Sequence, residues 1–329
     1  MKYLLLFHIV FLLLLWANKT HAQQDAQFSQ YMNNKLYYNP AAAGISRQYT
    51  QINAIHRSQW AGYQATFDDG GAPTTQVFSV DMPWTKYNVG TGLHFVHDQL
   101  GLVRNIEIQL SLAYQIKFDA GILAIGARAG AYNFSLNPNN LRPVDPNDPL
   151  IKDLIANGRF SQFTSDFAVG LFFQGKNNKY FASASMNHLQ RSDFSGNTQF
   201  GINQLSNHLT LMGGYHFDLS PTIVLTPSTI MKTDFNVYSF EGSLTGTYEG
   251  KYSLGVSMRE QEAAIVMLGM NLLPDEKLGY KLRLGYSFDY TLEAKNAKET
   301  ASHEILLTYR LPAPKFYTPN PIRSPRFRF

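Results

Sequence analysis

The sequence of 329 residues predicts an all-β protein, a transmembrane antiparallel β-barrel of about 14 strands with short periplasmic turns and longer extracellular loops. Three observations predict this fold. Apolar and polar residues alternate with a period of two along most of the chain from Ile45 to Leu311. Most of these runs reach the ~9–11 residues that a tilted membrane strand requires. Longer and tight connections follow one another between the runs, as in bacterial outer-membrane barrels.

The first 22 residues are typical of a cleaved secretory signal. Lys2 precedes an apolar run from Leu4 to Trp16, and a small residue, Ala22, follows it. About 13 apolar residues are too few to cross a ~30 Å hydrocarbon core, so this run is not a membrane helix. No later run of ~18 apolar residues follows. An exported chain without such a helix is expected to be a secreted β protein or an outer-membrane barrel.

Composition restricts the function classes. Cysteine is absent, which excludes a disulfide framework, a thiolate metal site and a lipoprotein anchor. Charged residues are only 16%, whereas aromatic residues reach 14%. The formal net charge of +4 equals the four basic residues of the tail, so the basic feature is one terminal segment and no nucleic-acid partner is expected.

Strands are predicted wherever alternation runs between turn residues. They are expected at residues 45–61, 73–84, 87–97, 102–118, 121–136, 162–175, 179–190, 204–219, 222–233, 236–249, 250–260, 262–273, 277–290 and 301–311. The even number of strands places both mature termini on the short-turn, periplasmic side.

The chemistry of the two faces separates a membrane barrel from a soluble sandwich. In "YKLRLGYSFDY" one face carries Leu282, Leu284 and Tyr286, and the other carries Arg283 and Asp289. Large aromatic residues would crowd the core of a sandwich, but they suit a surface that meets lipid. The polar face then lines a hydrated or plugged lumen.

Several blocks resemble the PorP/SprF family of outer-membrane proteins. They are "QDAQFSQYMNNKLYYNPAAAG", "HRSQW", "GAPTTQ", "SHEILLTY" and "SPRFRF", which are spread along the whole mature chain. "NNKLYY" departs from the plainer stretch that the family more often has. The resemblance implies a non-enzymatic outer-membrane component of the type IX secretion system and gliding machinery. It also implies two partners besides the lipid bilayer: a secreted cargo or adhesin with a type IX C-terminal domain, and a periplasmic peptidoglycan-binding or motor-linked protein.

On this basis the barrel is expected to help secrete or anchor a surface protein. The outer loops, especially residues 137–161 and 191–203, or the lumen would receive the cargo. The alternative is a plugged channel or transporter for small or hydrophobic solutes.

The domain organisation follows from these assignments. Residues 1–22 are the signal peptide, 23–44 an N-terminal segment, 45–311 the barrel and 312–329 a Pro-rich basic tail. The N-terminal segment lacks clean alternation, and it is either a periplasmic extension or a lumenal plug. In a plug, Tyr31, Tyr37, Tyr38 and Asn39 would contact the wall.

Arg57 in "HRSQW" is the strongest candidate on a strand. Alternation points it into the lumen, where an unpaired charge would be costly, so it should bond a carboxylate such as Asp166 or the N-terminal segment. A contact with a ligand is the alternative.

The tail carries the other partner candidates. Proline removes backbone donors, so the tail should form no strand; it is either disordered or held as an extended peptide by a periplasmic partner. Its candidates are Arg323, Arg326, Arg328 and Phe329.

No catalytic, metal or cofactor site is predicted. Asp68 and Asp69 could bind Ca²⁺, although adjacent acids beside Gly-Gly are more often a solvated turn. With His97 and Asp98 they could also resemble the rim carboxylates of barrel proteases. The glycines of "GTG", Gly90 to Gly92, are attributed to barrel curvature.

Overall fold

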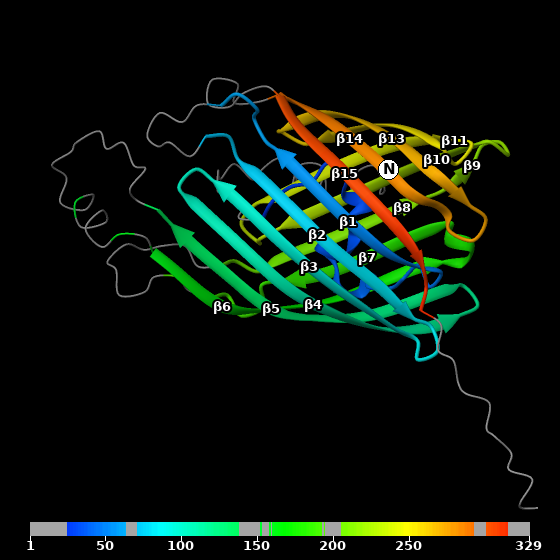
Figure 1. The fold of residues 1–329 in the computed structure, drawn as a ribbon, viewed down its shortest axis with the longest axis horizontal. Helices are drawn as coiled ribbons and strands as arrows, with labels where there is room; N and C mark the ends of the chain where they lie inside the picture. Colours follow the sequence, from blue (N-terminus) through cyan, green and yellow to red (C-terminus); the bar gives the residue numbers. More distant parts are fainter. Residues whose placement is uncertain are drawn as a thin grey trace, which may run out of the picture.

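The computed structural model describes residues 25–63, 71–137, 152, 158, 160–192, 194, 205–292 and 301–314. Within them every strand pairs with its neighbours in the chain, and the ring is closed (Figure 1). The strands are β1 (Tyr49–Ser58), β2 (Thr74–Trp84), β3 (Val89–Leu100), β4 (Val103–Phe118), β5 (Gly121–Leu136), β6 (Phe160–Gly175), β7 (Tyr180–Asn187), β8 (His208–Tyr215), β9 (Phe217–Asp218), β10 (Ile223–Thr233), β11 (Tyr238–Tyr248), β12 (Tyr252–Arg259), β13 (Ala263–Asp275), β14 (Gly279–Thr291) and β15 (Ala301–Pro312).

The wall has fourteen strands in its described part, because β8 and β9 are one wall strand interrupted at His216. Both pair antiparallel with β10. The seam between the ends of the chain is the pairing of β1 with β15, in which Arg57 lies opposite Glu304. The predicted barrel of about 14 antiparallel strands is therefore confirmed.

The two faces of the wall differ as predicted. In β4, Ile108, Leu110 and Leu112 are 53%, 61% and 56% exposed, whereas Gln109 and Ser111 are 1% and 0% exposed. An apolar outside around a polar inside inverts the pattern of a soluble protein. It is stable only where lipid covers the outside, because so much apolar surface is unfavourable in water. The polar side chains face the lumen because hydrocarbon cannot satisfy their hydrogen bonds.

The connections define two ends of the barrel. One end, called the short-turn end, carries only tight turns among the described elements, and it lies at the lower right of Figure 1. The other, called the long-connection end, carries the links 59–73, 137–159, 188–207 and 292–300. The predicted alternation is not strict, because the links 101–102, 234–237 and 260–262 at the long-connection end are also tight. Links of two to four residues suffice at these three positions.

Residues 25–44, called here the lumenal segment, lie inside the ring and appear in dark blue in Figure 1. The segment contains the short helices η1 (Tyr31–Asn33), α2 (Lys35–Tyr38) and η2 (Pro40–Ala42). One further short helix among the described residues, η4 (Lys176–Asn178), belongs to a tight turn. No helix of the described residues has the length and hydropathy needed to cross a membrane.

The lumenal segment runs the length of the barrel in the direction opposite to β1. Asp25 contacts His188 and His208 at the long-connection end, whereas Gly44 lies against Pro83 and Gly90 near the short-turn end. The even number of strands correctly places the start of β1 at the short-turn end. It does not place the residues before β1, because the described N-terminal end lies at the opposite end.

Candidate functional site: the lumenal segment and its seat

Three aromatic residues of the lumenal segment form its centre. The rings of Tyr37 and Tyr38 each meet Phe28 edge to face, with centroids 5.0 Å and 6.5 Å apart. Tyr31 is 0% exposed, and its hydroxyl lies 3.0 Å from Ser228 Oγ and 2.8 Å from Ser243 Oγ on the wall. Burial raises the pKa of Tyr31 to about 12, so this hydroxyl stays neutral and pairs with neutral partners. The segment thus has its own small core and specific wall contacts.

The stretch "NPAAAG" lies directly against the wall backbone. Asn39 Nδ2 donates to the carbonyl oxygens of Leu171 and Ala184 at 2.8 Å and 3.1 Å. Its Oδ1 accepts from the Ala41 N–H at 2.8 Å and so begins helix η2. One side chain therefore both shapes the segment and binds β6 and β7.

Two wall glycines permit this close approach. A Cβ on Gly126 would lie 2.3 Å from Ala41 N, and one on Gly90 would lie 1.9 Å from the Ala43 carbonyl oxygen. Only glycine fits at these distances. Gly90, which the sequence attributes to barrel curvature, makes room for the lumenal segment.

Arg128 of β5 holds the end of helix α2. Its guanidinium donates to the Tyr37 carbonyl oxygen at 2.9 Å, to the Leu36 carbonyl oxygen, and to Ser111 Oγ at 3.1 Å. The last carbonyls of a helix have no partner within it and carry partial negative charge. A wall cation thus satisfies groups that would otherwise be buried without donors.

A second cluster joins the segment to the seam of the barrel. Arg57 on β1 lies 2.7 Å from Asp289 Oδ2 on β14 and 3.4 Å from Glu304 Oε2 on β15. All three side chains are at most 2% exposed. One guanidinium between two carboxylates does not satisfy all four of their oxygen atoms.

The lumenal segment supplies the missing donors. The backbone N–H groups of Ser29 and Gln30 donate to the two oxygens of Glu304 at 2.8 Å and 3.0 Å. Ser29 Oγ accepts from Arg57 Nη1 at 2.8 Å and donates to Asp289, which lies 2.7 Å away. Buried charges persist only where hydrogen bonds satisfy them, so the seat formed by Arg57, Asp289 and Glu304 requires the segment.

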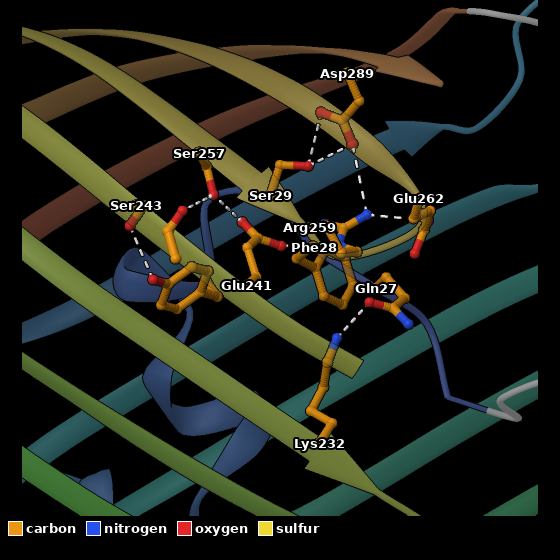
Figure 2. A network of polar contacts seen from close by, with 12 residues as sticks. Gln27, Phe28, Ser29, Lys232, Glu241, Ser243, Ser257, Arg259, Glu262 and Asp289 are labelled. Atoms are coloured by element: carbon orange, nitrogen blue, oxygen red, sulfur yellow. Dashed lines mark hydrogen bonds and ion pairs between the residues drawn. The ribbon is translucent and has the colours of Figure 1, made fainter. Parts of the chain in front are cut away.

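Figure 2 shows the part of this network around Arg259. Arg259 on β12 is 0% exposed and contacts Glu241 at 2.8 Å and Glu262 at 3.1 Å. It also lies 3.8 Å from Asp289, which connects it to the Arg57 cluster. Ser29 and Gln27 of the lumenal segment reach this group from the inside, where Lys232 donates to Gln27. Asp289 thus joins the Arg57 cluster and the Arg259 cluster.

The structure places the sequence-predicted residues as follows. Tyr31, Tyr37, Tyr38 and Asn39 are all buried on the wall, and Arg57 points inward. Asp166 is not the partner of Arg57; it accepts from Gln109 Nε2 at 2.7 Å on another part of the wall. Arg323, Arg326, Arg328 and Phe329, together with Asp68 and Asp69, lie outside the described residues.

His97 and Asp98 do not form the pair of a barrel protease. As neighbours on β3 they point to opposite faces, His97 toward Gln76 and Asp98 toward Thr75.

Sequence reasoning missed the wall side of the seat. The sequence does not identify Asp289 and Glu304 as partners of Arg57, nor Ser29 and Gln30 of the lumenal segment as the donors that complete the seat. A signal existed, since Asp289 and Glu304 are acids on the inward-facing positions of their strands. Which acid would meet Arg57 depends on the closure of β1 on β15, which no local pattern reveals.

Comparison with known protein families identifies the chain. Residues 20–309 match the family described as type IX secretion system membrane protein PorP/SprF. The chain belongs to the PorP/SprF family. The resemblance that the N-terminal block and "HRSQW" indicated is therefore confirmed, and this PorP/SprF barrel is a membrane component of type IX secretion.

Solved structures add information on the fold alone. The toluene transporter TbuX of Ralstonia pickettii is 10% identical with a TM-score of 0.51, over 85% of this chain and 93% of that chain. A deltaS2S3 mutant of the monoaromatic hydrocarbon channel TodX is 10% identical with a TM-score of 0.51, over 84% of this chain and 94% of that chain. Curated protein sequences give no match to this PorP/SprF chain.

Proposed function

We propose that this PorP/SprF barrel helps to secrete or anchor a surface protein that carries a type IX C-terminal domain, by noncovalent contact and without catalysis. The observation that carries the proposal is the family match along residues 20–309, together with a barrel whose lumen holds its own segment. A lumen filled by a hydrogen-bonded segment favours a docking role over free diffusion.

The long-connection end is the surface for this cargo. Outer-membrane barrels place their long connections outside the cell and their short turns in the periplasm. With that orientation, residues 137–161 and 191–203 would meet the cargo. The rigid seat of Arg57, Asp289 and Glu304 would keep the lumenal segment in place beneath it.

The short-turn end is the surface for the periplasmic partner. Ala313 hydrogen-bonds to Gln48 there, beside the start of β1, so the chain leaves the wall on this side. The tail that follows, with Arg323, Arg326, Arg328 and Phe329, would then reach a periplasmic peptidoglycan-binding or motor-linked protein. Its basic and aromatic residues suit an acidic, partly apolar groove.

The test is purification of the full-length barrel from native outer membranes under mild detergent, followed by identification of bound proteins. The proposal expects a secreted protein with a type IX C-terminal domain in stoichiometric amount. A variant truncated after Pro312 is expected to keep this cargo and lose the periplasmic partner.

The alternative, a channel for small or hydrophobic solutes, is tested on the same preparation. A cavity of about 340 Å³ lies beside the lumenal segment, which is the observation in favour of a passage. Solute flux through the purified barrel in liposomes, with no cargo recovered from native membranes, would overturn the secretion proposal.

A further inference from the structure

Three residues outside the seat meet at the long-connection end of the lumen. Asp25 begins the described part of the lumenal segment, His188 follows β7, and His208 opens β8. Each offers one ligand atom, and these atoms lie within 4.8 Å of one another. His188 Nε2 is 3.0 Å from Asp25 Oδ1, and His208 Nδ1 contacts Asp25 Oδ2. Two imidazoles thus converge on one carboxylate.

A second carboxylate orients one of these imidazoles from behind. Asp166 Oδ2 lies 3.0 Å from Nδ1 of His188, on the side of the ring away from Asp25. Asp166 is itself fixed, because Gln109 and the Phe167 N–H donate to it at 2.7 Å and 2.9 Å. A histidine that binds a metal usually has a carboxylate beside its other ring nitrogen, and Asp166 takes that position at His188. An ion pair between His188 and Asp25 alone would not need a second carboxylate at the other ring nitrogen of His188.

The three residues leave room for one small ligand. A cavity of about 20 Å³ is lined by the three residues and by Glu107, Asp166, Arg128 and Lys232. That volume suits a single water molecule. Oxygen and imidazole nitrogen atoms, the usual ligands of a divalent metal, therefore dominate the side of the cavity that Asp25 faces. The Nε2 atom of His208 is buried and has no hydrogen-bond partner among the described residues.

We propose that Asp25, His188 and His208 form a site for a divalent transition metal of the zinc class, which fixes the start of the lumenal segment to β7 and β8. Two imidazoles and one carboxylate, with a fourth position for water, are a ligand set that Zn²⁺ accepts and that Ca²⁺ and Mg²⁺ do not favour. Asp25 and His188 are 163 positions apart in the chain, and His188 and His208 are 20 positions apart, so no short sequence motif indicates the site.

The proposal is tested on the full-length barrel, purified and stripped with chelator, by titration with Zn²⁺ against a competing fluorescent chelator. The wild type should bind one Zn²⁺ per chain, and the H188A and H208A variants should lose that binding. Asp166→Asn should weaken binding by about 10–100-fold, as loss of an orienting carboxylate does. The matched control is H56A, because His56 is exposed on the outer face.

Folding is checked for each variant by the heat-modifiable migration of the closed barrel in gels. Zn²⁺ should also raise the thermal unfolding midpoint of the wild type and not that of H208A, because a metal that binds only the folded state stabilises it. Absence of Zn²⁺ binding to the wild type would overturn the proposal. So would folded H188A and H208A variants that bind as tightly as the wild type.

Discussion

Arg57 and Asp289 form an ion pair of 2.7 Å inside the barrel, and the hydroxyl of Ser29 hydrogen-bonds to both. The pair links strands at opposite ends of the chain, and the lumenal segment is its third member. The stability of the seam and the position of the segment are therefore expected to respond together to substitution.

The first prediction concerns Arg57→Ala. This variant leaves Glu304 buried without a cation and leaves Asp289 with only Arg259, 3.8 Å away, which should lower the free energy of unfolding by about 3–5 kcal/mol. The measurement is urea unfolding in detergent or lipid. The matched control is Arg104→Ala, because Arg104 is exposed on β4. Equal stability of the two variants would show that the cluster contributes nothing.

The second prediction tests the close packing of the lumenal segment against the backbone of the wall, without any change of charge. Gly126→Val places side-chain atoms where the Ala41 backbone lies 2.3 Å from an added Cβ. We expect a loss of about 1–3 kcal/mol or displacement of the segment, as overpacking produces. Gly246→Val on β11 is the control, since an added Cβ there meets nothing closer than 3.9 Å. A Gly126→Val barrel as stable as this control would contradict the close approach.

The third prediction uses the absence of cysteine. A single Ala26→Cys reports on access to the lumenal segment, because maleimide reacts only with an accessible thiol. Glu304→Gln removes the charge that binds Arg57 and the Ser29 and Gln30 amides, so labelling should become faster. Glu276→Gln, in a turn at the short-turn end, should leave the rate unchanged. A rate that stays slow in Glu304→Gln would show that Glu304 does not hold the segment.

The fourth prediction concerns pH in the presence of chelator. Burial alone would lower the pKa of His188, but Asp25 and Asp166 outweigh it and hold the pKa well above its ordinary value of 6.5. Burial likewise would raise the pKa of Asp25, yet His208 and His188 hold it well below 3.8. The His188 contribution is complete below pH 6.5 and is lost as the pH rises through the raised pKa; that of Asp25 is lost only in strong acid.

Thermal unfolding midpoints at a series of pH values check this sign. The difference between the wild type and His188→Gln should shrink as the pH rises above the pKa of folded His188. A difference that grows with alkaline pH would contradict a charged His188 held by Asp25.

The wall could be predicted from the sequence, because alternation is a local property that burial on one face enforces. The expected strand 121–136 coincides with β5. The fit of the segment could not be predicted in the same way. Glu304 meets Ser29 across 275 positions in the chain, and that contact depends on the closure of the ring. For the same reason the sequence predicts a lumenal carboxylate or the N-terminal segment as the partner of Arg57, with Asp166 as an example, but does not identify Asp289 and Glu304.

The closing pair β1 and β15 has a consequence for assembly. Ser29 is synthesised first among the residues of its seat, and Glu304 last. If β1 paired with β15 while the lumen was empty, Arg57, Asp289 and Glu304 would be buried without the hydrogen-bond donors that the lumenal segment supplies. Full satisfaction of these charges therefore requires the lumenal segment to lie inside the ring when β1 pairs with β15.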